Sequence, residues 1–416
     1  MRLTMSERRA VIRQAAAGYR KSSKKRKGQW LDELVALTGY HRWYAVRLLR
    51  AHGRTVRRAG RVRFVADVGL QARRGRQPVY DAPVLKALKS LWAIMDCLCG
   101  KRLKAILPEV IVALERHREI RLSAPVRRKL LAISPATIDR LLAPSRRQFE
   151  LRGRSGTKPG TLLKHQIPIR TFTEWDNARP GFLEIDLVGH DGGVASGDFC
   201  QTLDATDVAS GWTETEAVLN KAQVWVFQAL KDIRTRLPFA LLGIDSDNGS
   251  EFINQELLRY CQSEHITFTR GRAYKKNDGC FIEQKNYSVV RRAVGYARYE
   301  GVADLQCLNE LYRHLRLYTN FFQPVMKLVR KERNGARVKK TYDAPKTPYR
   351  RLLALPGLGK VRRLQLDAQY AQLNPAQLKR DITRLQQRLI QGARTRSGPA
   401  GTAPACSPDT MRALEP

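Results

Sequence analysis

The sequence predicts a multidomain protein with an N-terminal all-α region, an α/β core with a mixed sheet, and a basic C-terminal region. Its 416 residues exceed one ordinary core, because a domain takes about 100–200 residues. Apolar residues recur at helical spacing over residues 1–150, whereas strand-like runs alternate with helical stretches after residue 180. This change of period separates the α region from the α/β core.

The chain is strongly basic, with 76 Lys and Arg against 38 Asp and Glu and a net charge of +38. Residues 1–180 hold 41 basic and 13 acidic side chains and residues 301–416 hold 22 and 8, whereas residues 181–300 hold 13 and 17. A polyanionic partner is indicated, and nucleic acid fits better than an anionic membrane. We expect the flanks to bind phosphates and the acidic middle to attract cations.

The cysteines argue against a disulfide framework and against a zinc ribbon. They number seven, an odd count without a Cys-x-x-Cys pair. The N-terminus lacks an apolar signal segment, and no uncharged apolar run approaches the ~20 residues that span a bilayer. We expect a soluble, cytoplasmic protein with no membrane partner.

Residues 1–52 follow a helix-turn-helix pattern. After a helix over Ser6–Tyr19 and a basic linker over Arg20–Gly28, we expect two helices, Trp30–Leu37 and His41–Ala51, joined by a turn at Gly39. The spacing is equally typical of an ordinary helical hairpin, and the basic charge favours DNA binding.

The second helix of this pair has distinct inner and outer faces. Val46 and Leu49 are expected to face inward, while Arg42, Arg47 and Arg50 are free to contact DNA. These three arginines are the candidate DNA contacts of the N-terminal region.

Residues 53–77 are rich in Arg and Gly and are expected to form a basic linker. Residues 78–150 are expected to be helical, with Ser134 capping a helix whose first residue is Pro135. A second helix-turn-helix fits this region, and so does a helical bundle that acts as a spacer. The four expected helices are Pro83–Cys97, Leu103–His117, Ala124–Leu131 and Pro135–Leu142.

Residues 151–164 are expected to form a linker and residues 165–325 the α/β core. The core should contain three early strands followed by alternating helices and strands, which indicates a mixed sheet. The expected strands are Phe182–Val188, Asp198–Thr206, Trp212–Val218, Ala240–Ile244 and Ile266–Thr269, and the expected helices are Lys221–Leu237, Glu251–Glu264 and Cys280–Arg298. Beyond the core we expect an irregular basic region, 326–391, with one helix at Pro375–Ile390, and a disordered tail, 392–416.

Carboxylates gather at three places in the core. Asp186 shares one face of its strand with Glu184, Asp245 and Asp247 follow a strand end, and Glu283 begins a helix 35 residues after Asp247. Each acid alone has an ordinary structural explanation, such as a turn or a helix cap. Together, in a basic protein, they indicate a divalent cation held against phosphates, because Mg²⁺ prefers oxygen ligands. We interpret the nearby His190 and Asp191 as structural.

These motifs resemble the bacterial insertion-sequence transposases whose core is the retroviral-integrase catalytic domain. The matching residues are Glu184-Ile185-Asp186, Asp247-Asn248-Gly249-Ser250-Glu251-Phe252, Lys276-Asn277-Asp278 and Ile282-Glu283-Gln284-Lys285-Asn286, and the 35-residue gap matches as well. The resemblance covers residues 165–300 and implies an RNase H-like fold with an Asp, Asp, Glu (DDE) triad.

Carried over to this chain, the resemblance makes Asp186, Asp247 and Glu283 the catalytic metal ligands, with Asp245 as the rival for the second place. It implies two Mg²⁺ ions, or Mn²⁺ in their place, and no protein nucleophile. No His and Cys pairs stand close enough for the zinc module of retroviral integrases, so zinc is not expected. The basic residues near the third acid are candidate phosphate contacts, or a solvated helix face: Lys275, Lys276, Lys285, Arg291 and Arg292.

The resemblance implies a transposase that cleaves the ends of a mobile element and joins them to target DNA. Its partners would be double-stranded DNA and further copies of the chain, because two ends must be paired. A catalytically silent DNA-binding regulator is the alternative, and a plain RNase H-like nuclease is a third reading. The intact triad argues against the regulator, and the basic N-terminal region argues against the nuclease.

Overall fold

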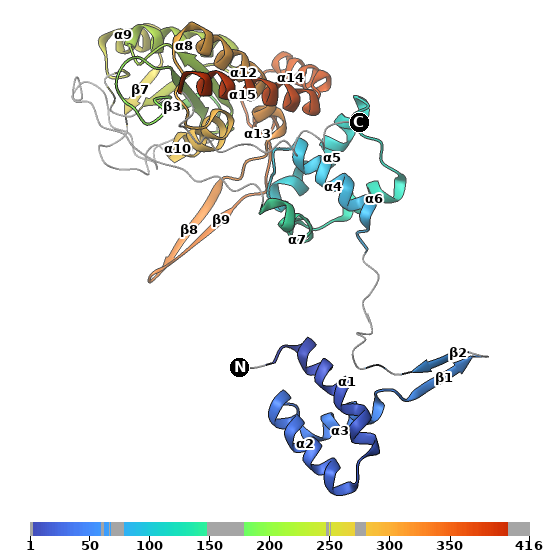
Figure 1. The fold of residues 1–416 in the computed structure, drawn as a ribbon. Coiled ribbons are helices and arrows are strands. Elements are labelled where there is room, and N and C mark those ends of the chain that lie inside the picture. The colour runs from blue at the N-terminus through green and yellow to red at the C-terminus, as the bar shows by residue number, and fades with distance from the viewer. Residues whose placement is uncertain are drawn as a thin grey trace. The chain divides into compact units, whose positions relative to one another are not determined.

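The computed structural model describes residues 3–59, 62–65, 67, 79–147, 179–246, 249, 251–270 and 280–397. For some residues in helices and strands, Glu283 among them, it describes the backbone alone. The chain divides into two compact units, Met1–Val79 and Tyr80–Pro416, whose folds Figure 1 shows. No helix of the described ranges has the length and apolar composition needed to cross a membrane.

The first unit is a three-helix cluster followed by two paired strands. Its helices are α1 (Met5–Lys21), α2 (Lys24–Thr38) and α3 (Arg42–Ala51), and its strands are β1 (Thr55–Ala59) and β2 (Val62–Val65). The helices pack around a small apolar core that includes Ile12, Leu34 and Leu49. The strands lie in the segment expected to be a linker.

The start of α2 corrects the linker expected at Arg20–Gly28. The Ser23 side chain accepts a hydrogen bond from the backbone N–H of Arg26, so Ser23 caps a helix that already begins at Lys24. At the other end, Gly39 has a φ of +67° and ends α2 in the left-handed conformation, which glycine adopts without steric cost.

The second unit begins with the four helices that the sequence predicts: α4 (Ala82–Ile94), α5 (Gly100–Arg116), α6 (Ala124–Ala132) and α7 (Pro135–Arg146). Ser134 caps α7 through the backbone N–H of Thr137, as expected. The four helices share one continuous apolar core with the α/β part. They are therefore part of the body that carries the sheet.

The centre of the second unit is a five-stranded mixed sheet, as predicted. Its strands are β3 (Phe182–Gly189), β4 (Gln201–Asp207), β5 (Thr213–Val218), β6 (Gly243–Ser246) and β7 (Thr267–Arg270), in the order β5-β4-β3-β6-β7. The pairs β3–β4 and β4–β5 are antiparallel, whereas β3–β6 and β6–β7 are parallel. This arrangement, with helices against the sheet, is compatible with an RNase H-like core (Figure 1).

Three helices extend the core beyond the sheet. They are α8 (Gln223–Arg236), α9 (Gln255–Ser263) and α12 (Gly301–Phe322). Between β7 and α12 lies one interrupted helical segment made of α10 (Cys280–Lys285), the π-helix η2 (Asn286–Arg291) and α11 (Arg292–Val294). The single helix expected over Cys280–Arg298 therefore ends early, because Gly295 takes a φ of +71°.

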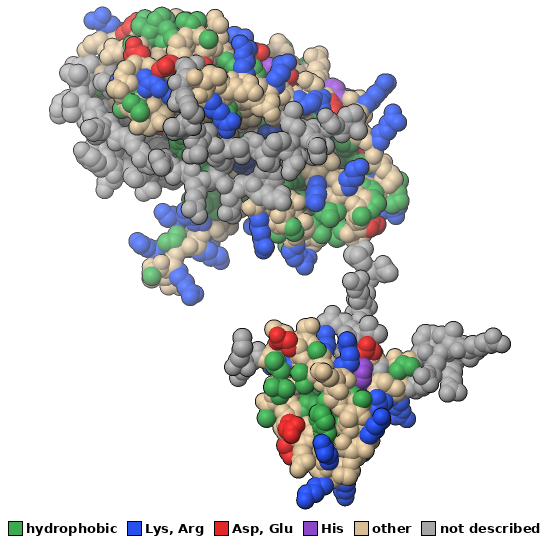
Figure 2. Space-filling view, viewed as in Figure 1, with side chains coloured by type: hydrophobic (Ala, Val, Ile, Leu, Met, Phe, Trp, Pro, Cys, Tyr) green, Lys and Arg blue, Asp and Glu red, His purple; other side chains and the backbone are tan. Residues whose placement is uncertain are grey.

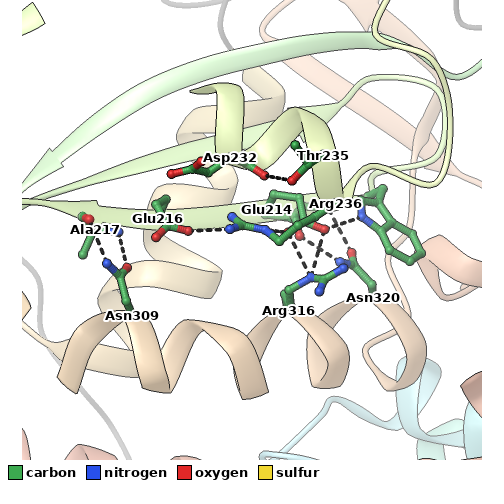
Figure 3. A network of polar contacts seen from close by, with 11 residues as sticks. Glu214, Glu216, Ala217, Asp232, Thr235, Arg236, Asn309, Arg316 and Asn320 are labelled. Atoms are coloured by element: carbon green, nitrogen blue, oxygen red, sulfur yellow. Dashed lines mark hydrogen bonds and ion pairs between the residues drawn. The ribbon is translucent and has the colours of Figure 1, made fainter. Parts of the chain in front are cut away.

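The edge strand β5 is protected by α12 and α8 (Figure 3). Asn309 and Asn320 of α12 each accept from and donate to one β5 residue, Ala217 and Thr213 respectively, so their amides occupy backbone groups that an edge strand leaves open. The fully buried Glu214 carboxylate accepts from the indole N–H of Trp212 at 2.9 Å. It also pairs with Arg316 of α12 at 3.0 Å and with Arg236 of α8 at 3.4 Å.

The C-terminal region is more regular than the sequence analysis predicts. It contains the antiparallel strands β8 (Leu328–Asn334) and β9 (Arg337–Tyr342), then α13 (Pro348–Ala354), α14 (Lys360–Gln372) and α15 (Pro375–Ser397). The hairpin was missed because its strands lack apolar alternation; the Asn334-Gly335 pair was the available signal. Helix α15 starts where predicted and continues past Ile390.

Candidate active site

Two acidic side chains lie on one face of the central strand β3. Glu184 is 1% exposed and Asp186 is half-buried, while Leu183 and Ile185 point into the core on the other face. Burying a carboxylate is costly unless it is hydrogen-bonded, paired or bound to a metal. The contacts of these two acids therefore bear directly on their role.

Both acids hold the helical segment that carries Glu283. The Glu184 carboxylate accepts a hydrogen bond from the backbone N–H of Ile282 at 2.9 Å. The Asp186 carboxylate accepts one from the Asn286 side-chain amide at 2.6 Å. The backbone of Glu283 thus lies between two points at which its helix is attached to β3.

The two attachments fit because strand and helix spacings agree. Two residues along a strand span about 6.6 Å, and four residues along a helix span about 6 Å. Glu184 and Asp186 can therefore contact Ile282 and Asn286 at the same time without bending either element. The sequence analysis placed Glu184 beside Asp186, and the structure adds what the pair does.

A π-helix begins at the second attachment point. It spans Asn286–Arg291, and its neighbouring residues Val289 and Val290 are both buried. Short π-helical segments inside α-helices are frequent at functional sites. Here the π-helix starts at the residue that contacts the first predicted metal ligand.

Asp204 is an acid of this site that the sequence analysis missed. It lies on β4 directly opposite Asp186 and on the same face, and its side chain is fully buried. Neither of its carboxylate oxygens has a hydrogen-bond partner. Burial raises the pKa of Asp204 well above its usual range, the charge of Lys285 opposes this rise, and the nearby Asp186 adds to it. The available signal was the polar alternation of Thr202, Asp204 and Thr206 in a buried strand.

Lys285 lies inside the protein beside this acid. It is 7% exposed, and its ammonium donates to the carbonyl oxygen of Gly211 at 3.2 Å. Burial lowers the pKa of Lys285 to about 8, and the negative charge of Asp204 opposes that change. Lys285, which the sequence suggested as a phosphate contact, here contacts the protein interior.

The two rival middle acids differ in their place on β6. Asp245 lies within the strand rather than beyond its end, because β6 covers Gly243–Ser246 and not Ala240–Ile244. The Asp245 side chain is buried and accepts from the hydroxyl of Thr269 on β7 at 2.6 Å. It therefore links two strands of the sheet. Asp247 lies outside the described residues.

The remaining basic residues predicted near the third acid fall into two groups. Lys275 and Lys276 lie outside the described residues. Arg291 donates to the carbonyl oxygens of Gly189 and Gly295, and Arg292 pairs with Asp96 at 2.7 Å. Both arginines thus join the helical segment to neighbouring parts of the second unit.

The arginines predicted to read DNA lie on the exposed face of α3. Arg42, Arg47 and Arg50 are all exposed, while Leu49 is buried as expected. Arg42 pairs with Asp32 of α2, and the Arg47 guanidinium lies over the rings of Trp43 and Tyr44 at 5.5 and 5.4 Å from their centroids. Trp43 is itself 66% exposed, which makes the first turn of α3 an open aromatic and basic surface.

His190 is held between β4 and α12. It is fully buried, its Nε2 shares a hydrogen bond of 2.7 Å with the Thr202 hydroxyl, and that hydroxyl bonds to Tyr312 at 2.7 Å. Burial, assisted by the positive charge of Arg291, lowers the pKa of His190 from 6.5 to about 3. The ring is therefore neutral in the folded protein.

Acidification is expected to destabilise the second unit through His190. Because the folded-state pKa lies below that of the unfolded chain, the unfolded state binds more protons between pH 6.5 and about 3, and the free energy of unfolding falls as the pH drops through this window. Between pH 7 and about pH 5 the loss should be about 2 kcal/mol. Urea unfolding at both pH values checks it, with His190→Gln as the non-titrating control. An equal pH dependence in both proteins would show that His190 is not the cause.

The described donors suit a hard divalent cation. No group of three His, Cys, Asp or Glu side chains with metal-ligand geometry occurs among the residues that the structure describes, and these exclude the side chains of Asp247 and Glu283. The carboxylates of Asp186 and Asp204 lie side by side on one face, and Asp204 has no hydrogen-bond donor. Such oxygen donors fit Mg²⁺ or Mn²⁺ better than a softer metal.

Comparisons with known proteins give one relative and two weaker structural similarities. The chain is 40% identical over 352 residues to the uncharacterized protein y4rM of Sinorhizobium fredii, covering 84% of this chain and 96% of that protein. It is 18% identical to the catalytic core domain of BIV integrase, with 42% and 93% of the two chains covered and a TM-score of 0.29. For the HTLV-2 integrase catalytic core domain in complex with magnesium, the values are 16%, 36%, 93% and 0.28. No protein-family model matches the chain.

Proposed function

The chain belongs to the protein family that includes y4rM, and we propose that it is a DDE-type transposase. In this proposal it cleaves DNA at the ends of a mobile element and joins them to target DNA in a metal-dependent reaction. The observation that carries the proposal is the double attachment of β3 to the helical segment of Glu283, through Glu184 to Ile282 and through Asp186 to Asn286. These contacts connect the first and third predicted acids, which are far apart in sequence.

The proposed metal ligands are Asp186, Asp247 and Glu283. Bound Mg²⁺ or Mn²⁺ would supply Lewis acidity at the reacting phosphate. The Asn286 amide orients the Asp186 carboxylate by the hydrogen bond it donates, and it limits the rotation of that carboxylate. Glu184 fixes the start of the helix from below the site, since it is almost fully buried.

Asp247 is preferred over Asp245 as the second ligand on structural grounds as well. The Asp245 carboxylate is engaged by Thr269 inside the sheet. Strand β6 ends at Ser246, level with Ile185 and therefore one residue short of Asp186 along β3. The chain leaves the sheet next to the first acid, which is where a second ligand is needed.

DNA binding would come from the basic flanks. The exposed face of α3, with Arg42, Arg47 and Arg50, is the proposed reader of duplex DNA, in the manner of a helix-turn-helix. Because two DNA ends must be brought together before joining, we propose that the active form is an oligomer on DNA.

A strand-transfer assay tests the proposal and the choice of the second ligand. DNA carrying the terminal repeats that flank the gene is incubated with the protein and Mg²⁺ or Mn²⁺. Wild type should cut and join this DNA, Asp247→Asn should lose at least about 10²-fold of the rate, and Asp245→Asn should retain most of it. Full activity of Asp247→Asn would refute the metal assignment. Specific DNA binding by wild type without cutting or joining would favour a silent DNA-binding regulator.

A further inference from the structure

The strands β8 and β9 form an arm that projects from the second unit (Figure 1). We call residues 328–342 the basic hairpin. Its strands pair only with each other among the described strands, and nearly all of their side chains are exposed. A two-residue turn at Gly335-Ala336 closes the hairpin, and Gly335 has the positive φ of +60° that such turns require at their first position. At about 3.4 Å per residue, the arm is about 20 Å long.

The charge of the basic hairpin is almost entirely positive. It carries six Lys and Arg and one acid, Glu332, which pairs with Arg330 at 2.7 Å. Lys331 and Lys340 face each other directly across the two strands, an arrangement that weakens an isolated hairpin. Among the described residues no acid pairs with the other five basic side chains, and Figure 2 shows Lys and Arg along the arm. These five are Lys331, Arg333, Arg337, Lys339 and Lys340.

The root of the arm is fixed to the core by buried charges. Arg351 is 9% exposed, and its guanidinium donates to the Asp343 carboxylate and to the carbonyl oxygen of Val325. Asp343 also accepts from the backbone N–H of Lys327 at 2.7 Å. The Lys327 ammonium donates to the carbonyl oxygens of Val208 and Ala209, just after β4. The arm is therefore an exposed ribbon on a rigid base.

The root also lies near the candidate active site along the sheet. Val208 is four residues from Asp204 in the chain, a path of about 13 Å along β4. Asp204 in turn is the cross-strand partner of Asp186. A polyanion held by the arm would thus start within about one turn of a nucleic-acid helix from the acids.

We propose that the basic hairpin is a DNA-binding arm that enters the major groove of duplex DNA beside the active site. The major groove of B-DNA is about 12 Å wide and about 8.5 Å deep and admits a two-stranded ribbon. The deep, narrow major groove of A-form RNA does not admit such side chains, so the geometry selects DNA. Phosphates on both sides of the groove neutralise the like charges that face each other on the arm.

This inference rests on the proposed function for its biological role, but its test does not need catalysis. Binding to a short fluorescent DNA duplex of mixed sequence is measured by anisotropy between about 50 and 200 mM salt. The full chain is compared with a hairpin variant that replaces three exposed lysines by glutamine: Lys331→Gln, Lys339→Gln and Lys340→Gln. A matched control removes three exposed basic charges from α14 and α15: Lys360→Gln, Arg362→Gln and Arg388→Gln.

The hairpin variant should bind DNA at least about tenfold more weakly than the control variant at low salt. The slope of log K against log salt should become less steep by about 2–3, because each lost phosphate contact contributes about 0.9. An RNA duplex of the same sequence should show a much smaller difference between the two variants.

Other outcomes overturn the inference. Equal DNA affinity and equal salt slopes for the hairpin and control variants would exclude a DNA contact, and an equal loss on RNA would exclude insertion into the major groove. A change in oligomeric state with unchanged DNA binding would make the arm a contact between copies. The failure of the proposed function is a separate result: wild type and Asp186→Asn would then bind DNA equally, and neither would cut it.

Discussion

Replacement of Asp186 by Asn is expected to lower the rates of DNA cleavage and strand transfer by at least about 10³-fold, equivalent to about 4 kcal/mol in the activation barrier. Asn has the size of Asp and can still accept the hydrogen bond from Asn286, so the attachment of β3 to the helical segment persists. It lacks the negative charge that a divalent cation requires. The rates are measured with purified protein on DNA that carries the terminal repeats.

Two observations make this result specific. The thermal unfolding temperature and the DNA affinity of Asp186→Asn should match those of wild type. Asp198→Asn, the same change at an exposed position before β4, should retain full activity. If Asp186→Asn is as active as wild type, β3 does not carry a metal ligand.

Glu214→Ala is expected to be the most destabilising single change in the sheet, with a loss of about 3–5 kcal/mol in the free energy of unfolding. Glu214 is fully buried and bonds to Trp212, Arg236 and Arg316, so its removal leaves two guanidinium groups without their shared carboxylate. Helices α8 and α12 both depend on it for their position against β5 (Figure 3). Urea unfolding of the purified protein measures the loss.

The control for this prediction is an ion pair at the surface. Glu264 pairs with Arg234 at 2.8 Å, and both side chains are more than a third exposed or close to it. Glu264→Ala should cost about 0–1 kcal/mol, because exposed pairs gain little from solvent-screened attraction. Similar losses in both variants would mean that the buried network contributes no more than a surface pair.

The mixed sheet could be predicted because its strands carry local signals. Leu183 and Ile185 alternate with Glu184 and Asp186, and the strand on β6 is a short apolar run. The exact bounds of β6 could not, because a strand's ends are set by its partners. Pairing with β3 and β7 extends β6 to Ser246 and draws Asp245 into the sheet.

Other elements were missed because their signals are not periodic. Strands β8 and β9 are exposed on both faces, so no apolar pattern marks them. The π-helix at Asn286–Arg291 has the composition of an ordinary helix. Asp204 looked like one more strand residue, since only the register with β3 shows that it faces Asp186.

The sequence by itself determined the charge distribution, the helical N-terminal region, the mixed sheet and the spacing of the three predicted acids. These properties depend on composition and on neighbours within a few residues, which the chain order contains. Tertiary structure alone decided that Glu184 and Asp186 hold the helix of Glu283, that Lys285 is buried beside Asp204, and that the basic hairpin projects from a buried root. Those contacts join residues about 100 positions apart or depend on strand register, and only packing brings such residues together.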